Sequence, residues 1–273
     1  MKKINFRTRR YIALAATAFA LLIVWIASWI EETRLGHASH LTGFSALGAL
    51  LLLMLLGMRR RLPMLPLGSV ATWTQIHIYT GIFATGVFIM HVPALVGGGK
   101  FEFALSLFFW VVAVSGFYGV YASRTLPKRL TAIEGQHRFD RVQWHRNQIS
   151  EAAEKLLSEN AETPAGKVLG KFYYETLLPF FTQRPSLVYV LVPTGSRRRR
   201  LLGNLKDLNR YLEHDSRSTA GRFAALVRKR DDLDYQYALQ LRLRLWVVVH
   251  AVFSVVLTAA AIVHGVLAFR FTI

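Results

Sequence analysis

Four histidines lie in two segments that are otherwise almost entirely apolar: His77 and His91 in one, and His250 and His264 in the other. The histidines of each pair are 14 residues apart. At roughly 100° and 1.5 Å per residue, this spacing returns the second imidazole to nearly the same helix face, about 21 Å further along the axis. Imidazole nitrogen is a common ligand of transition metals. The spacing therefore predicts two metal levels shared by two helices.

The composition of these segments favours iron in haem over zinc or non-haem iron. Sites of the latter kinds normally add carboxylates or a third ligand, and neither segment contains Asp or Glu. A b-type haem with two axial histidines needs no further protein ligand. A structural, hydrogen-bonded role is the alternative for any single histidine. Ionisable groups at membrane depth are costly, however, so two matched pairs favour ligation: His77 with His250, and His91 with His264.

Small residues stand near the histidines, where a flat macrocycle could approach the backbone. Gly81 follows His77 by four residues, and Ser254 follows His250 by four. We predict that both help to bind the haem. The same residues could instead allow membrane helices to pack closely, and the sequence leaves both interpretations open.

The composition indicates an integral membrane protein. Of the 273 residues, 53% are hydrophobic, the formal net charge is +18, and the chain contains no cysteine. Apolar residues in long runs are typical of membrane helices. The absence of cysteine excludes disulfides, thiolate-bound iron–sulfur clusters, thioether-attached haem and Cys-based zinc sites in this chain.

Five apolar runs approach or exceed the length of about 20 residues that a helix needs to cross a bilayer. They are Tyr11–Ile30, Leu41–Met58, Val70–Val96, Phe103–Ser123 and Leu245–Phe269. We predict an all-α membrane protein with five transmembrane helices. Four are expected in residues 1–123, and the fifth, in residues 245–273, completes a di-haem four-helix bundle. The first run exceeds the apolar core of a signal peptide, which favours a membrane helix over a cleaved leader.

Basic residues predict the orientation, because they are retained on the cytoplasmic side of a membrane. The N-terminus, the run Arg59 to Arg61 and the segment after Arg124 are basic, whereas the two opposite loops are nearly neutral. We therefore expect a multi-pass protein of a prokaryotic cytoplasmic membrane, with its N-terminus cytoplasmic and its C-terminus outside. The two histidine-bearing helices are separated by one span, so they run parallel.

Residues 124–244 form a basic cytoplasmic insertion that we predict to be mainly helical. Amphipathic patterns favour helices near Gln148–Asn160, Lys167–Phe181 and Leu205–Leu212. The β-branched run from Leu187 to Val192, followed by Pro-Thr-Gly, predicts a short hairpin across Leu187–Leu202.

Two further groups of residues suggest partners. The run Arg197 to Arg200 favours anionic lipid or an acidic partner subunit over nucleic acid, since it lies in a juxtamembrane segment. His37 and His40, in an outer loop, could serve a quinol proton path, although ordinary solvated loop histidines are the alternative.

The four ligand candidates give the chain a resemblance to the di-haem transmembrane cytochrome b class, which includes the N-terminal bundle of cytochrome b and ferric-reductase-like membrane domains. In that class, two helices separated by one span each carry two haem ligands about 14 residues apart. The resemblance covers the second to fifth predicted helices and implies axial haem ligation at His77, His91, His250 and His264. A Pro-Glu-Trp-Tyr quinol motif and a flavin or nicotinamide domain are missing, so donor and acceptor stay open.

Three functions agree with this pattern. The first is a di-haem cytochrome subunit of a membrane redox complex, relaying electrons between a quinol or cytoplasmic donor and a partner redox protein. The second is a membrane reductase of a small acceptor such as ferric iron, for which a copurifying flavoprotein would be diagnostic. The third is a non-redox membrane scaffold with structural histidines, which would be colourless when purified.

Overall fold

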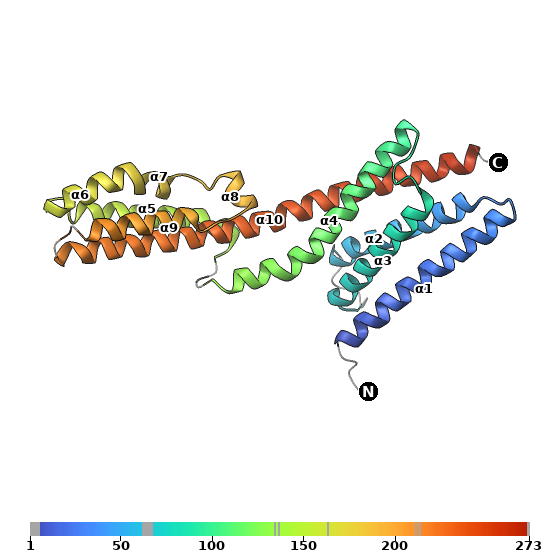
Figure 1. The fold of residues 1–273 in the computed structure, drawn as a ribbon, viewed down its shortest axis with the longest axis horizontal. Helices are drawn as coiled ribbons and strands as arrows, with labels where there is room; N and C mark the ends of the chain where they lie inside the picture. The colour runs from blue at the N-terminus through green and yellow to red at the C-terminus, as the bar shows by residue number, and fades with distance from the viewer. Residues whose placement is uncertain are drawn as a thin grey trace. The chain divides into compact units, whose positions relative to one another are not determined.

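The computed structural model describes residues 6–61, 68–133, 135, 137–162, 164–210, 212 and 214–271, and these residues form helices and no β-strand. The all-α class is thus confirmed for the described part of the chain. In chain order (Figure 1), the elements are α1 (Phe6–Thr33), α2 (Ala38–Arg61), α3 (Val70–His91), α4 (Lys100–Thr131), η1 (Phe139–Arg141), α5 (Val142–Ser158), α6 (Pro164–Phe172), the π-helical turn η2 (Tyr173–Leu177), α7 (Leu178–Thr182), α8 (Leu187–Leu191), α9 (Ser196–Asn209) and α10 (His214–Phe271).

Four of these helices are long and apolar enough to cross a membrane: α1, α2, α4 and α10. Helix α3 also corresponds to a predicted span but is not among the four. It carries Gln75, His77, His91 and several threonines, and these polar side chains lower its mean hydropathy. The histidines that make α3 a candidate site are therefore among its polar residues.

Helix α3 ends earlier than expected. It begins at Val70, where the Ser69 hydroxyl accepts a hydrogen bond from the Thr72 amide at 3.1 Å. It ends at His91 rather than at Val96, because Val92 precedes a proline and leaves the helical region, with φ −128° and ψ 79°. A residue before proline disfavours the α conformation. His91 is thus the last residue of its helix.

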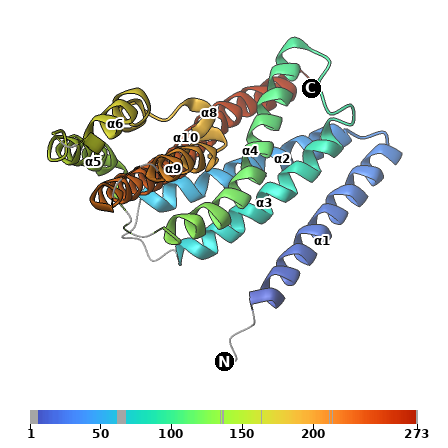
Figure 2. The ribbon, with the colours of Figure 1, turned by 60° about the vertical axis from the view of Figure 1, so that its left-hand side comes forward.

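The chain divides into two compact units, of which the first contains residues 1–121 and 246–273. Within it, α1, α2 and α3 pack side by side (Figures 1 and 2). At Gly86 of α3, an added Cβ would come within 2.6 Å of the Leu21 side chain on α1. A glycine at this position lets the two helices approach closely.

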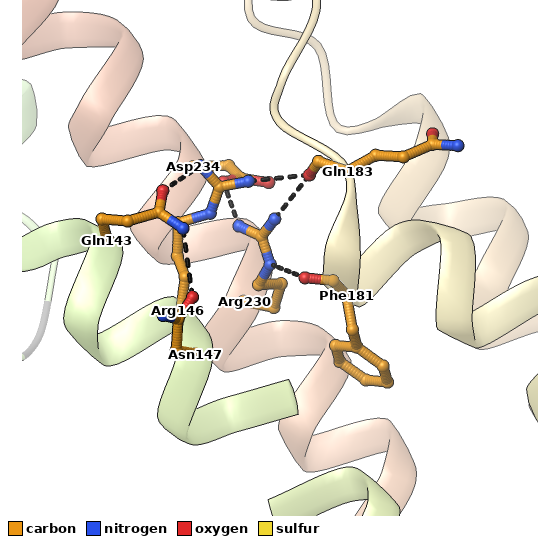
Figure 3. Close-up of polar contacts among 7 residues, drawn as sticks. All are labelled: Gln143, Arg146, Asn147, Phe181, Gln183, Arg230 and Asp234. Atoms are coloured by element: carbon orange, nitrogen blue, oxygen red, sulfur yellow. Dashed lines mark hydrogen bonds and ion pairs between the residues drawn. The ribbon is translucent and has the colours of Figure 1, made fainter. Parts of the chain in front are cut away.

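The second unit contains residues 122–245. Its core is built by apolar side chains from α5, η2, α7, α9 and α10, among them Ile149, Tyr173, Phe180, Leu205 and Phe223. Beside this core lies a polar cluster formed by Arg146, Arg230 and Asp234, together with backbone carbonyls at the end of α7 (Figure 3).

The predicted hairpin at Leu187–Leu202 is wrong. The apolar run forms the short helix α8, and α9 begins at Ser196. The Ser186 hydroxyl accepts a hydrogen bond from the Tyr189 amide and so caps α8, as serine commonly does at a helix N-terminus. The Pro-Thr-Gly sequence does mark a connection, but it joins two helices.

Helix α10 is far longer than the predicted fifth span. It runs without a break from His214 to Phe271, which is 58 residues, whereas we expected a helix from Leu245. Helix α4 likewise continues to Thr131, eight residues beyond the expected end at Ser123. Both helices contribute residues to each of the two units.

Candidate metal centres

The structure brings the four apolar-segment histidines together as two pairs within the first unit. The ring centroids of His77 and His250 are 6.2 Å apart, and those of His91 and His264 are 6.4 Å apart. With metal–nitrogen bonds of about 2 Å on each side, two imidazoles on opposite sides of one metal atom have centroids about 6 Å apart. Both pairs thus have the separation that a shared axial metal requires.

The two pairs also have similar orientations, with interplanar angles of 72° and 74°. The first histidine of α3 meets the first of α10, and the second meets the second. This order requires α3 and α10 to run in the same direction through the first unit. The partners are those expected from the sequence.

A backbone carbonyl fixes the proton of the His77 ring. Its Nδ1 lies 3.1 Å from the Leu53 carbonyl oxygen on α2. Because a carbonyl oxygen can only accept, Nδ1 carries the hydrogen and donates it, and Nε2 keeps its lone pair. Metal-binding histidines typically make such a hydrogen bond through their second nitrogen.

A hydroxyl group of α2 does the same for His91. Thr42 Oγ1 lies 3.1 Å from the Ala38 carbonyl oxygen and 3.1 Å from His91 Nδ1. With this hydroxyl proton on a backbone carbonyl, His91 donates to Thr42 Oγ1 in the tautomer that has its hydrogen on Nδ1 and its lone pair on Nε2. The next residue, Gly43, leaves room for the ring, since an added Cβ would come within 3.0 Å of His91 Cε1.

Helix α4 repeats this arrangement at His250. Ser115 Oγ donates to the Val112 carbonyl oxygen at 2.9 Å and lies 2.8 Å from His250 Nδ1. In the tautomer with its hydrogen on Nδ1, His250 donates to this oxygen and keeps its lone pair on Nε2. The following residue is again a glycine, Gly116, whose added Cβ would lie 3.5 Å from His250 Cε1. A hydroxyl residue followed by glycine thus supports one histidine at each level.

The indole ring of Trp246 lies against the His250 ring in the His77–His250 pair. Trp246 stacks on the His250 ring at 6.0 Å and donates its Nε1 hydrogen to the Ser115 carbonyl oxygen at 2.8 Å. Gly119 makes this position possible, because a Cβ there would overlap the Trp246 ring. At the other level, His264 lies against Phe101 at 6.1 Å between ring centroids.

An apolar layer separates the two histidine levels. It consists of Leu50, Phe88, Phe109 and Leu257, all buried. Leu257 is seven residues from both His250 and His264, and the rings of Phe88 and Phe109 stack at 3.8 Å. This layer comes from four different helices, and the sequence did not reveal it.

The small residues expected beside the macrocycles have different surroundings. An added Cβ at Gly81 would meet no atom within 4 Å, so open space lies beside this part of α3. The Ser254 hydroxyl donates to the His250 carbonyl oxygen at 2.6 Å. A haem-binding role for Gly81 and Ser254 stays a prediction.

Two other histidine pairs lie outside these centres. His37 and His40 have ring centroids 4.9 Å apart and line, with Glu31, an open cavity of about 830 Å³. In the second unit, the rings of His137 and His145 are 3.7 Å apart. Burial and the nearby His145 lower the pKa of His137, which favours its neutral form.

Larger metal-binding clusters do not accompany the pairs. In the part of the chain that the structure describes, no group of three or more His, Cys, Asp or Glu side chains could hold a metal ion. Comparisons with known proteins add no identity, since no family model, curated protein or solved structure matches the chain.

Proposed function

We propose that this chain binds two b-type haems and relays electrons across a membrane as a subunit of a redox complex. The observation that carries the proposal is the pair of matched imidazole separations, 6.2 and 6.4 Å, on two parallel helices. His77 and His250 would hold one haem, and His91 and His264 the other. The donor set of two neutral imidazoles per level suits iron in a porphyrin, which supplies the remaining four ligands.

Haem b would supply one-electron oxidation and reduction at each level, while the chain's own residues set the conditions for it. Hydrogen bonds from Nδ1 of His77, His91 and His250 would orient the rings and keep the Nε2 lone pair for the metal. The buried layer around Leu257 keeps water from the space between the levels. Low polarity and second-nitrogen hydrogen bonds are the means by which proteins tune a haem potential.

The proposal includes α3 as a fifth span, beside the four helices that are apolar enough by composition. Its polar residues His77 and His91 face α10 through the two ring pairs, so they need not contact lipid. The distribution of basic residues supports a cytoplasmic N-terminus and an external C-terminus in a prokaryotic inner membrane. A quinol or a cytoplasmic protein is the proposed donor, and another subunit the acceptor.

A visible spectrum of the purified protein tests the central claim. We expect the dithionite-reduced protein to show the α-band of low-spin, six-coordinate haem b, with two haems per chain by pyridine haemochrome. Two bound haems support the relay, and one indicates that only a single pair is occupied. A folded, membrane-inserted but colourless protein would contradict the proposal and favour a scaffold.

The hydroxyl groups that accept from the histidines are expected to tune the potentials rather than to hold the haems. Thr42→Val and Ser115→Ala each remove one acceptor of an Nδ1 hydrogen. The imidazole then donates less electron density to ferric iron, and the potential of that haem should rise. A hydrogen bond contributes about 1 kcal/mol, so the rise should be up to about 40 mV.

Redox titration of the two variants measures this effect. Thr42→Val should move only the component assigned to His91 and His264, and Ser115→Ala only the other component. Thr85→Val provides a control, since the Thr85 hydroxyl of α3 donates to the Gly81 carbonyl oxygen and should leave both potentials unchanged. Equal shifts of both components in either variant would contradict these assignments.

A further inference from the structure

Helix α8 in the second unit has apolar side chains on two opposite faces, one buried and the other exposed to solvent. Val190 is buried, and Tyr189 is half-buried. The Tyr189 hydroxyl is hydrogen-bonded to Asp231 of α10, so this face packs against α10, and burial, together with Asp231 and Asp234, raises the pKa of that hydroxyl. The other face is apolar and exposed: Leu187 is 78% exposed, Val188 75%, Leu191 65% and Val192 64%.

The positions of these four side chains make them one surface. Leu187, Val188 and Leu191, at i, i+1 and i+4 of α8, fall within an arc of about 100° at 100° per residue, and Val192 is the residue that directly follows the helix. Single exposed apolar residues are normal on a protein surface. Three on one face of a short helix, with a fourth directly after it, are a typical sign that something apolar covers them.

Cationic side chains flank this apolar face along the chain. Arg184 precedes α8, and Arg199 and Arg200 follow it in α9; all three are exposed. None of the three forms an ion pair with another residue in the part of the chain described. The neighbouring Arg198, by contrast, pairs with Asp232 at 2.9 Å. The flanking charge is therefore available to an external anion.

We propose that α8 is an interfacial anchor that inserts its apolar face into an anionic phospholipid surface. Exposed apolar side chains with exposed arginines before and after them in the chain match the two layers of such a surface, acyl chains beneath and phosphates above. The chain has four helices apolar enough to cross a bilayer, and a bilayer provides the apolar phase that this proposal requires. An acidic protein would match the arginines but not the apolar face. The proposal does not depend on haem binding.

The absence of cysteine makes a site-specific test direct. A nitroxide is attached to Leu191→Cys in the full chain, which is placed in nanodiscs of phosphatidylcholine with or without phosphatidylglycerol. Tyr174→Cys is the matched control, because Tyr174 is 64% exposed against 65% for Leu191 and lies in η2. Collision with oxygen reports lipid contact, and collision with a water-soluble nickel chelate reports water contact.

We expect the oxygen-to-nickel accessibility ratio at residue 191 to be severalfold higher than at residue 174, and to rise further when phosphatidylglycerol is present. Combining Leu191→Cys with Arg184→Gln, Arg199→Gln and Arg200→Gln should abolish the phosphatidylglycerol effect, since each arginine near anionic lipid contributes about fivefold to binding. Equal ratios at the two labelled positions would overturn the proposal. A label at residue 191 that stays in water in both kinds of nanodisc would also overturn it, and that result would favour a protein partner for α8.

Discussion

Replacing His77 or His250 by alanine is expected to remove one and the same haem, and replacing His91 or His264 to remove the other. The two members of each pair lie 6.2 or 6.4 Å apart between ring centroids and would share one iron. Loss of either imidazole would leave that iron five-coordinate or that haem unbound. Each single variant should therefore keep one low-spin component of the two, which is a loss of half the low-spin haem.

Redox titration followed by visible spectroscopy distinguishes the two components. The surviving component should have the same potential in His77→Ala and His250→Ala, and a different one in His91→Ala and His264→Ala. His40→Ala is a control in the same unit: its ring faces His37 and Phe44 rather than a ligand candidate, and both haems should remain. If His77→Ala and His264→Ala removed the same component, the parallel arrangement of ligands would be wrong.

The pairing could be predicted because it depends on simple quantities. Helical periodicity places residues 14 apart on one face, and a single intervening span makes two membrane helices parallel. The long apolar runs likewise indicated where helices lie, although not where they end. The proline after Val92 shortens α3, and a proline of this kind is a signal in the sequence that the predicted end at Val96 overlooked.

The residues that hydrogen-bond to the histidines or make room for them were harder to predict from the sequence. Thr42 with Gly43 and Ser115 with Gly116 are ordinary dipeptides in apolar helices, and their role depends on which helix faces which histidine. The sequence does contain a signal, namely a hydroxyl residue followed by glycine in each of two neighbouring spans. This signal can be interpreted only when it is known which face of α2 and of α4 points toward the histidines.

The second unit is mainly helical, as predicted, but the start of α10 was missed because two charged residues interrupt its apolar pattern. Along α10, buried positions recur every three or four residues at Phe223, Val227, Arg230, Asp234 and Ala238. Periodicity analysis treats charged residues as solvent-facing, so the stripe was not recognised and a helix was expected only from Leu245. The error at α8 has a different origin, since a short β-branched run has no periodicity that separates strand from helix.

The same charged residues lead to a prediction for stability. The Arg230 side chain is fully buried; it donates to the Phe181 and Gln183 carbonyl oxygens at 3.3 and 2.8 Å and forms an ion pair with Asp234 (Figure 3). Arg146 on α5 donates to the same Gln183 oxygen at 2.7 Å. Burial lowers the pKa of Arg230 to about 10, so the side chain stays charged at neutral pH, and burial raises the pKa of Asp234.

Arg230→Met is expected to destabilise the second unit by about 3–5 kcal/mol. It removes the Arg230 donor from the Phe181 carbonyl oxygen, leaves the Gln183 carbonyl oxygen with Arg146 alone, and takes away one of the two arginines that neutralise the buried Asp234 carboxylate. About 1.4 kcal/mol corresponds to a tenfold change in the equilibrium constant for unfolding. Amide hydrogen exchange in α5 and α7 should therefore accelerate by about 100-fold or more. Arg222→Met on the same helix removes an exposed ion pair to Glu159 at 3.8 Å and should cost less than about 1 kcal/mol. Similar exchange rates in the two variants would show that the buried cluster does not hold α5, α7 and α10 together.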